Sequence, residues 1–598
     1  MRIEDYAIVG DCGTAALIGR NGSIDWLCWP RFDSRACFAS LVGTADNGRW
    51  LIAPRKEPKR VARRYLDDTL ILETTFETRH GAVVLVDFMP PRRDASDLVR
   101  VVRGVRGRVA MRAELVIRLD YGSLVPWVTR LSDGTLRAVA GPDMLVLRTP
   151  APLKGEHLKT VSEFTIEDGQ TMPFVLSYGP SYRELPRSID WQDALQDTIT
   201  FWKDWSGRFE DKGVYAGIVR RSLMVLKALT YEPTGGIVAA PTTSLPEELS
   251  GARNWDYRYC WLRDATFTLL ALMNSGYFDE AGRWRDWLLR AVAGTPSQVQ
   301  IMYGITGTRR LDEWEVPWLK GYEGTQPVRI GNAASTQLQL DIYGEVMDAL
   351  HLARCSGLGG DESAWALQVK LLEHLETIWH EPDEGIWEMR GPRQHFTFSK
   401  VMAWVAFDRA IKSAEKDRLE APLQKWAAIR DKIHAEVCDR AYDRELRSFT
   451  QSYSSKRLDA SLLLLALVGF LPPSDDRIRG TVRAIETTLI ENGLVRRYQT
   501  DETDDGLPGS EGVFLACSFW LADTYLLLGR RHDARRIFEH LLSLCNDVGL
   551  LSEEYDVAKG RMLGNFPQAL SHIGLINTAH NLMHGKKPAE QRSGHKLK

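Results

Sequence analysis

The stretch Asp383-Glu384-Gly385-Ile386-Trp387-Glu388-Met389-Arg390-Gly391 separates two long segments with the hydrophobic spacing of helices, residues 363–380 and 399–413. Because apolar residues recur there at three- and four-residue intervals, the nonapeptide between them is predicted to be a connecting loop. It places Glu388 directly beside the indole of Trp387. An apolar wall disfavours the charged form of a carboxyl group, so this loop predicts a general acid. The alternative is a packed ring beside a solvated charge.

Ten further segments with helical spacing occur between residues 215 and 584. Together with the two that flank the loop, they predict twelve helices joined by alternating short and long connections. This arrangement is typical of a closed toroid of six helix pairs, an (α/α)6 barrel. Long connections collected at one end of such a barrel would form a pocket. The ten segments are 215–231, 263–276, 279–294, 333–356, 417–439, 457–468, 475–490, 511–528, 531–545 and 566–584.

The first 190 residues have the pattern of β structure. The strand-like runs 15–19 and 23–29 flank Arg20-Asn21-Gly22, and an Asn-Gly between two such runs indicates a hairpin. Turn residues separate the later runs, which predicts a large antiparallel β-sandwich. These later runs are 69–78, 82–88, 99–105, 111–119, 144–148 and 174–178.

The change of pattern along the chain predicts four parts. We expect an N-terminal antiparallel β-sandwich at 1–190, a helical linker at 191–214 and the (α/α)6 barrel at 215–585. The last residues, 586–598, are polar and basic, and we expect them to form a frayed tail.

Composition narrows the class of protein. A net charge of −3 argues against nucleic acid or an anionic membrane as the main partner. The eight cysteines form no CxxC pair and no metal-ligand spacing, which is typical of free thiols in a reducing compartment. The N-terminus shows no secretory signal, and the longest apolar run, 461–471, is too short to cross a bilayer. We therefore expect a cytoplasmic protein, for which a homo-oligomer is compatible with the sequence.

The unusual residues are concentrated in the long connections. Asn254 to Asp264 combines aromatic, Arg and Asp residues at the start of a helix. Arg263 can donate to sugar hydroxyls in a fork while Asp264 accepts from them, although an Arg-Asp pair that caps the helix is an equal alternative. The fourth of these connections carries the acidic run 501–505, for which a metal site or proton donor is weighed against a solvated loop.

Several of these stretches resemble glycoside hydrolase family 15, which contains glucoamylases, glucodextranases and the bacterial and archaeal trehalases. The resemblance lies in Asn254 to Asp264, Gly385 to Gly391 and Leu551 to Gln568. The N-terminal run Ile8 to Leu17, with Asp25-Trp26-Leu27 and Pro30-Arg31-Phe32-Asp33, is similar to the trehalase-like N-terminal domain of that family. These motifs cover nearly the whole chain and occur in the family's order.

The resemblance implies a set of site residues. Glu388 matches the general acid and Glu553 the general base of an inverting glycosidase, whose carboxyl groups lie roughly 6.5–9.5 Å apart to admit a water. No cofactor and no metal are implied. Sugar-binding residues are expected at Tyr257, Trp261, Arg263, Asp264, Trp387 and Arg497, with Trp318, beside Trp314 and Tyr322, at the leaving-sugar site. A further expectation is that Arg31-Phe32-Asp33 helps to close the pocket, with ordinary interdomain packing as the alternative.

The sequence departs from the fungal members of the family at two places. Glu554 stands where they carry Gln after the base, which leaves open which of the two carboxylates works. Ser571-His572 stands where they place Trp, which removes an aromatic wall and favours a small disaccharide over starch-like chains.

The sequence and the family resemblance lead to three hypotheses about function. The first is an inverting, exo-acting α-glucosidase that releases β-glucose, with α,α-trehalose as substrate and hydrolysis of malto- or isomalto-oligosaccharides as the alternative. The second is a non-catalytic sugar-binding protein on the same scaffold. The third is a lyase or terpene cyclase with Asp501–Asp505 as its acid, which ranks last because that run lacks an apolar, aromatic-lined setting.

Overall fold

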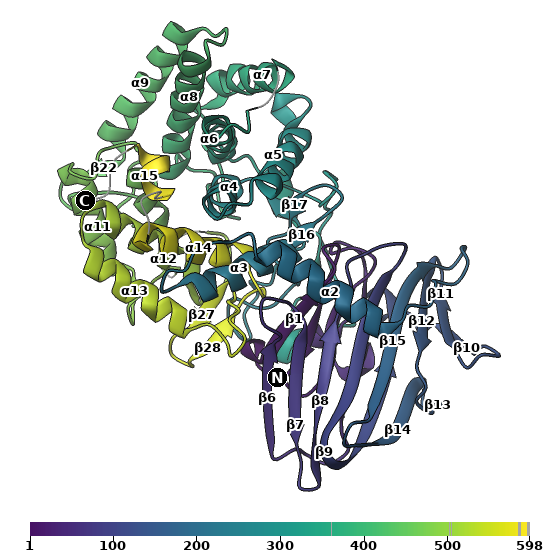
Figure 1. Ribbon diagram of the computed structural model, residues 1–598. Coiled ribbons are helices and arrows are strands. Elements are labelled where there is room, and N and C mark those ends of the chain that lie inside the picture. The colour runs from purple at the N-terminus through teal and green to yellow at the C-terminus, as the bar shows by residue number, and fades with distance from the viewer. Residues whose placement is uncertain (360–361, 501–502, 504, 584–587, 595–598) are drawn as a thin grey trace.

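The computed structural model describes residues 1–598 except 360–361, 501–502, 504, 584–587 and 595–598. A β-rich N-terminal part stands beside a ring of helices (Figure 1). The predicted fold class is confirmed, because an antiparallel sheet domain is followed by a helical barrel.

The predicted hairpin is present near the N-terminus. Strands β2 (Ala15–Gly19) and β3 (Ser23–Cys28) pair in antiparallel fashion. Gly22 in the turn has a φ of +81°, a conformation that glycine adopts at little cost. The Asn-Gly pair therefore identified the turn correctly, because the turn requires a residue that adopts a positive φ at little cost.

A single long strand joins the two layers of the β domain. Strand β9 (Ser96–Val116) pairs with β8 and β15 through its first half and with β5 and β14 through its second half. The prediction of two separate strands, 99–105 and 111–119, was wrong here. Gly107 has a φ of +66° and lets the strand bend while it stays paired.

The layers of the β domain meet through aromatic side chains. Phe174 of one layer contacts Trp50 and Phe164 of the other, with ring centroids 6.5 Å and 5.7 Å away. The other strands are β1 (Tyr6–Gly10), β4 (Ala36–Phe38), β5 (Arg49–Pro54), β6 (Arg60–Tyr65), β7 (Leu72–Glu77), β8 (Gly81–Phe88), β10 (Trp127–Arg130), β11 (Leu136–Ala140), β12 (Asp143–Arg148), β13 (Lys154–Glu156), β14 (Lys159–Glu167) and β15 (Thr171–Pro180).

Each of the twelve predicted helical segments contains a helix. Their bounds are α3 (Ala216–Ala228), α4 (Ala265–Asn274), α5 (Phe278–Val292), α6 (Asp341–Cys355), α7 (Glu362–Ile378), α8 (Thr397–Asp417), α9 (Leu423–Arg440), α10 (Leu464–Leu467), α11 (Asp476–Thr488), α12 (Leu515–Leu527), α13 (Arg531–Ser543) and α14 (Ala569–Met583).

Six of these helices form an inner ring. Each of α4, α6, α8, α10, α12 and α14 contacts the next, and α14 contacts α4, so the ring closes. Residues on every side of α4 and α12 are buried, as a helix enclosed by others requires. The outer helices α5, α11 and α13 bury one face only. The connections at one end of this ring carry the predicted site residues.

Helix α2 (Trp191–Ser206) contacts both parts of the molecule. Ala194 packs in a cluster with β-strand residues, and Trp205 stacks on Tyr277 at the edge of the barrel, with centroids 4.2 Å apart. We propose that the boundary between the two domains falls within this helix and the segment that follows it, as the sequence suggested.

The C-terminal end differs from the predicted tail. Residues Pro588–Ser593 form helix α15, and Arg592 is buried against α6. Its guanidinium donates to Glu345 (2.9 Å) and Asp348 (2.7 Å). The polar composition of this segment predicted solvent exposure. Arg592 is buried instead, because it pairs with carboxylates about 250 positions earlier in the chain. Local sequence patterns do not reveal partners at such a separation.

Candidate active site

A pocket lies among the long connections at one end of the barrel. Five of the predicted site residues line it, namely Tyr257, Arg263, Trp387, Glu388 and Arg497. They come from three different connections, so the barrel brings distant parts of the chain to one place. The remaining lining residues are Glu247, Arg253, Trp255, Arg390, Tyr498, Leu507 and Phe514.

Glu388 is held in a left-handed turn. Its φ is +57°, and its backbone N–H donates to the carbonyl of Gly385 at 3.2 Å. A left-handed conformation is unfavourable for a non-glycine residue and is found where surrounding contacts enforce it, often at functional sites. Here the indole N–H of Trp261 donates to Oε1 of Glu388 at 2.6 Å, and Arg263 lies 3.7 Å from the same oxygen.

Arg263 and Asp264 hold the loop of Glu388 rather than cap the helix. Arg263 donates to the carbonyl of Ile386 (3.1 Å) and to Asp264 (3.2 Å). Asp264 precedes α4, but its side chain makes no capping hydrogen bond. Burial raises the pKa of Asp264, and Arg263 opposes this rise. The helix-capping alternative is therefore wrong for this pair.

Trp387 lines the pocket with its ring but does not donate to Glu388. Its N–H donates to both oxygens of Asp459 at 2.9 Å, and its ring stacks on Trp520 with centroids 5.8 Å apart. The indole N–H that reaches the carboxylate of Glu388 belongs to Trp261 instead. Sequence adjacency predicted Trp387 as an apolar wall and gave no indication that Trp261 donates to Glu388.

Glu553 is almost fully enclosed, with an exposed fraction of 1 %. The backbone N–H of Asn565 donates to Oε2 at 3.2 Å, and Oε1 accepts no hydrogen bond from the part of the chain that the structure describes. Burial, followed by the negative charge of Glu247, raises the pKa of Glu553 to about 8, and the hydroxyl of Tyr257 and the cation of Arg497 oppose the rise. This carboxylate is therefore a stronger base than an ordinary glutamate.

Tyr257 lies close to both glutamates. Burial raises the pKa of its hydroxyl well above the usual value, and the charges of Glu553, Glu247 and Glu388 raise it further. Its ring also packs edge-on against Trp261, with centroids 5.1 Å apart. Tyr257 therefore stands within electrostatic reach of the two predicted catalytic carboxylates.

Glu554 faces a different set of partners from its neighbour. It begins strand β27 (Glu554–Asp556), where successive side chains point to opposite sides. One carboxylate oxygen accepts from the backbone N–H of Gly512 at 2.9 Å, and the other lies 3.4 Å from Arg497. Burial raises the pKa of Glu554 well above the usual value.

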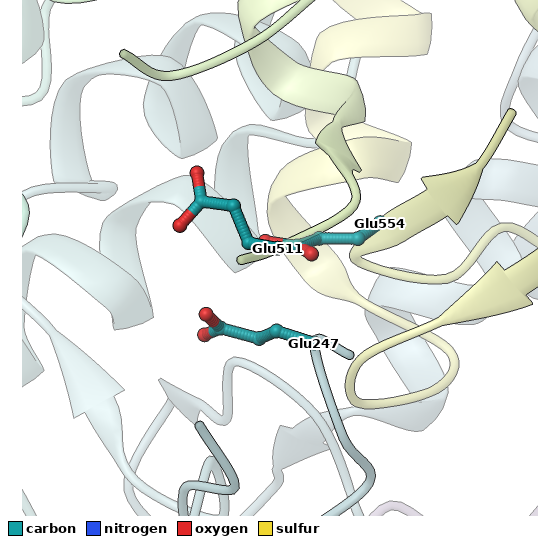
Figure 2. A group of neighbouring side chains, drawn as sticks. All are labelled: Glu247, Glu511 and Glu554. Atoms are coloured by element: carbon teal, nitrogen blue, oxygen red, sulfur yellow. The ribbon is translucent and has the colours of Figure 1, made fainter. Parts of the chain in front are cut away.

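Three carboxylates gather at one side of the pocket, and one of them, Glu247, lines it. Figure 2 shows Glu247, Glu511 and Glu554 reaching into one space from three segments, and their oxygens come within 4.8 Å of one another. The guanidinium of Arg497 lies among them and donates to Glu511 (2.9 Å) and Glu247 (2.8 Å). This side chain supplies the positive charge that three close carboxylates require, so the arrangement is a buried ion-pair network.

The connection that carries the acidic run 501–505 is only partly described by the structure. Asp501, Glu502 and Asp504 of the acidic run lie outside the described residues. Asp505 is buried and accepts from Arg253 at 2.7 Å and from the hydroxyl of Tyr498 at 2.9 Å. At this position the solvated-loop interpretation is wrong, because the carboxylate is buried and holds Arg253 and Tyr498, which line the pocket.

The structure does not bring Trp318 into the pocket. Its indole N–H donates to the carbonyl of Tyr121 in the β domain at 2.9 Å, and 42 % of the residue is exposed. Trp314 packs beside Trp318, and the hydroxyl of Tyr322 donates to the carbonyl of Met1 at 2.9 Å. The connection that carries Trp314, Trp318 and Tyr322 contacts the β domain, and residue spacing in the sequence does not reveal this contact.

Residues of the β domain contact the connection Asn254 to Asp264. Arg258 is fully buried and donates to Asp256 (2.6 Å), to the carbonyl of Ser34 (2.8 Å) and to the hydroxyl of Tyr121 (3.0 Å). The stretch around Arg31-Phe32-Asp33 therefore contacts this loop through Arg258 and is not part of the pocket lining. Ordinary interdomain packing is the interpretation that these contacts favour.

His572 occupies the position without an aromatic wall. Its Nε2 accepts from the backbone N–H of Leu551 at 3.2 Å, and its Nδ1 lies 2.9 Å from the hydroxyl of Ser222. Burial lowers its pKa to about 3, so the imidazole is neutral and can accept at Nε2. His572 thus holds the segment that leads into Glu553.

Several residues of the site were not assigned a role from the sequence, and four of them pair with other residues of the site. Glu247 and Arg253 precede the aromatic-rich connection, Asp459 holds Trp387, and Glu511 holds Arg497. The charged pair in Pro246-Glu247-Glu248 within a long connection was the one available signal. No helix in the described part of the chain is long and apolar enough to cross a membrane.

Comparison with known proteins covers nearly the whole chain. Residues 213–580 match the model of "Glycosyl hydrolases family 15", and residues 1–175 match the model "Trehalase-like, N-terminal". The trehalase of Mycobacterium tuberculosis is 38 % identical over 98 % of this chain and 90 % of its own length. The trehalase of Thermoplasma volcanium is 35 % identical over 97 % of this chain and 93 % of its own.

The fold is also found among solved structures. A bacterial glucoamylase complexed with acarbose superposes with a TM-score of 0.75, covering 100 % of this chain and 96 % of that one at 13 % identity. At this identity the likeness shows the fold. The matches to both family models and to relatives above 30 % identity lead to one conclusion: the chain belongs to glycosyl hydrolases family 15 and is a glycoside hydrolase with a trehalase-like N-terminal domain.

Proposed function

We propose that this glycoside hydrolase is an exo-acting, inverting trehalase that cleaves α,α-trehalose into two glucose molecules. The proposal is supported by two observations: Tyr257 and Glu388 line the same pocket, and Tyr257 is near enough to Glu553 for each to influence the pKa of the other. An inverting glycosidase requires one carboxyl group that donates a proton and a second that activates water on the opposite face of the sugar. The names of the relatives support trehalose as the substrate.

Glu388 is the proton donor in this proposal. Oε1 is occupied by the indole N–H of Trp261, which leaves Oε2 to carry the proton toward the glycosidic oxygen. As the bond between this oxygen and the anomeric carbon breaks, the proton neutralises the leaving glucose, and Glu388 becomes a carboxylate. Trp261 and Arg263 then stabilise the negative charge that forms on Glu388.

Glu553 is the general base. Its Oε1 is buried and accepts no hydrogen bond from the described residues, so it is placed to accept one from the attacking water. The water loses a proton to Glu553 while its oxygen bonds to the anomeric carbon from the face opposite the leaving sugar. The attacked glucose is therefore released as the β anomer, and the other as the α anomer.

The sugar would be held by the ion pairs around the pocket. Arg263 and Arg497 present guanidinium groups that donate in a fork, and Trp387 and Tyr257 supply ring faces. No step of this reaction calls for a cofactor. The eight cysteines are unpaired, which fits a reducing compartment such as the cytoplasm.

Proton NMR of the purified protein with trehalose, maltose, isomaltose and maltotriose tests the proposal. The expected result is β-glucose and α-glucose in equal amounts as the first products from trehalose, with the other sugars cleaved slowly. β-Glucose from the malto- or isomalto-sugars alone would move the substrate to the glucoamylase-like alternative. α-Glucose alone as the first product from trehalose would overturn the inverting mechanism, because retention would release both glucose units as the α anomer.

A further inference from the structure

Glu247 pairs with Arg497 and is close enough to Glu553 to influence its pKa. It is buried, lines the pocket together with Tyr257 and Glu388, and accepts from Arg497 at 2.8 Å. It comes from the connection that precedes the aromatic-rich stretch, a segment to which the reaction proposed above gives no role. A buried carboxylate that faces an active-site pocket needs a reason, because its desolvation is costly unless it is paired.

Backbone hydrogen bonds fix Glu247 from three directions. Its N–H donates to the carbonyl of Arg253 at 3.1 Å, and its carbonyl accepts from Gly512 at 3.0 Å. The preceding carbonyl, of Pro246, accepts from Gly564 at 2.8 Å. Gly564 packs on Glu553 so closely that a Cβ there would lie 2.5 Å from Oε2. The loop of Glu247 is thus joined directly to the wall of the base.

The groups near Glu553 include both negative and positive charges. Glu247 and its own neighbour Glu554 are acidic, Arg497 is cationic, and Tyr257 contributes a hydroxyl. Among the charged groups, Glu247 has the largest influence on the pKa of Glu553, and it raises this pKa. The ion pair with Arg497 opposes the rise that burial causes in the pKa of Glu247 itself.

We infer that Glu247 is a positioning residue of this active site, which holds Arg497 at the sugar pocket and keeps Glu553 a strong proton acceptor. The inference rests on the proposed roles of Glu553 and Arg497. Glu247 then has two roles. Its carboxylate orients the guanidinium of Arg497, and its negative charge offsets the effect of that guanidinium on Glu553. Without Glu247, Arg497 and Tyr257 would be the dominant neighbours of Glu553.

Two variants separate these roles. Glu247→Gln removes the charge and keeps the size of the side chain, so Glu553 should ionise at lower pH, and the acidic limb of kcat/KM should move down by about one pH unit or more. Glu247→Asp keeps the charge and should keep the limb near its wild-type position.

Glu511→Gln is the matched control. Glu511 also binds Arg497, at 2.9 Å, and is part of the same cluster, but it is not among the main influences on Glu553. Its removal should raise KM by loosening Arg497, with a shift of the acidic limb smaller than that of Glu247→Gln. Circular dichroism and the melting temperature of each variant show that it is folded.

The outcomes are distinguishable. A downward shift of the limb in Glu247→Gln, restored in Glu247→Asp and smaller in Glu511→Gln, supports the inference. An unmoved limb in a folded, active Glu247→Gln protein, or equal shifts in both glutamine variants, overturns it. For a Glu247→Gln protein that does not fold, Glu247→Asp decides: a limb displaced to low pH despite the retained charge overturns the inference, and an unmoved limb with raised KM supports it.

Failure of the proposed function gives a different pattern. If the wild-type protein cleaves no α-glucoside, or if Glu553→Gln retains full turnover, the assignment of the base is wrong whatever Glu247 does. If Glu553→Gln is inactive while the limb is insensitive to Glu247, only the inference about Glu247 falls.

Discussion

Glu388 and Glu553 lie near the same tyrosine, yet their neighbours differ in charge. The side chain of Glu388 is 19 % exposed and meets an indole N–H and a guanidinium. Glu553 is 1 % exposed and meets the acidic side chain of Glu247. In sequence the two glutamates look alike, since each follows a short apolar stretch in a connecting loop.

The difference suggests how one pocket can hold both a proton donor and a proton acceptor. Donors beside Glu388 stabilise the carboxylate that remains after its proton has been transferred. An anionic neighbour beside Glu553 makes that carboxylate a better acceptor for the proton of water. Environment, and not residue type, separates the two roles.

The largest expected effect comes from removing either carboxylate. Glu553→Gln should lower turnover of trehalose about 10²- to 10⁴-fold, because the general base is lost, and it should do the same with α-glucosyl fluoride. Glu388→Gln should lower turnover of trehalose by a similar factor but leave α-glucosyl fluoride nearly unaffected, since fluoride departs without a proton. Steady-state kinetics on both substrates measure this, and the reverse pattern would exchange the two roles.

A smaller effect is expected from displacing the base without removing it. Gly564 has a φ of +70°, and a Cβ there would lie 2.5 Å from Oε2 of Glu553. Gly564→Ala should therefore lower kcat about 10- to 100-fold by moving the carboxylate. Gly560→Ala is the matched control, because Gly560 has a φ of +60° with its nearest neighbour 3.8 Å away. Equal losses of kcat in both would mean that backbone strain alone is responsible.

The pH dependence should report the surroundings of Glu553. A base works only when ionised, and burial and Glu247 raise the pKa of Glu553 to about 8. Activity should thus rise with pH through this region, and kcat/KM should fall about tenfold for each pH unit below it. Measured pH profiles check the sign and position. An acidic limb near the ordinary glutamate value of 4.5 would contradict the burial of this group.

A more modest loss is expected on the other side of the pocket. Trp261→Phe keeps the ring but removes the N–H that donates to Glu388 at 2.6 Å. A hydrogen bond to a charged group contributes about 1.5 kcal/mol, so kcat should fall roughly tenfold. Trp318→Phe removes an N–H bound to Tyr121 instead and should change kcat and KM less than about twofold, as is usual for surface positions. A raised KM in Trp318→Phe would support the predicted leaving-sugar site.

Much of the architecture could be predicted from local patterns. The spacing of apolar residues located the twelve helices, because a helix that packs against others must bury a face of fixed period. Asn21-Gly22 located the first hairpin, because its turn requires a positive φ. The two halves of β9 were separated by mistake, since a bent strand and a turn share the same glycine-rich composition.

The site residues also divide into those that local motifs identified and those whose contacts only the fold creates. A motif within one connection led to Trp261, Arg263 and Asp264, and a motif within another led to Glu388, because each motif is local in sequence. Only the fold brings the two connections together, so that Trp261 donates to Glu388 although the two residues are 127 positions apart.

By itself, the sequence determined the helical and strand segments, the loops between them and the carboxylates available for chemistry, because each of these depends on neighbours within a few residues. Only the tertiary structure decided that Glu247 lies beside Arg497, that Arg592 is buried on α6 and that Trp387 donates to Asp459. These contacts join residues about 70 to 250 positions apart. Their energies depend on burial and charge, which exist only after the ring of helices has closed.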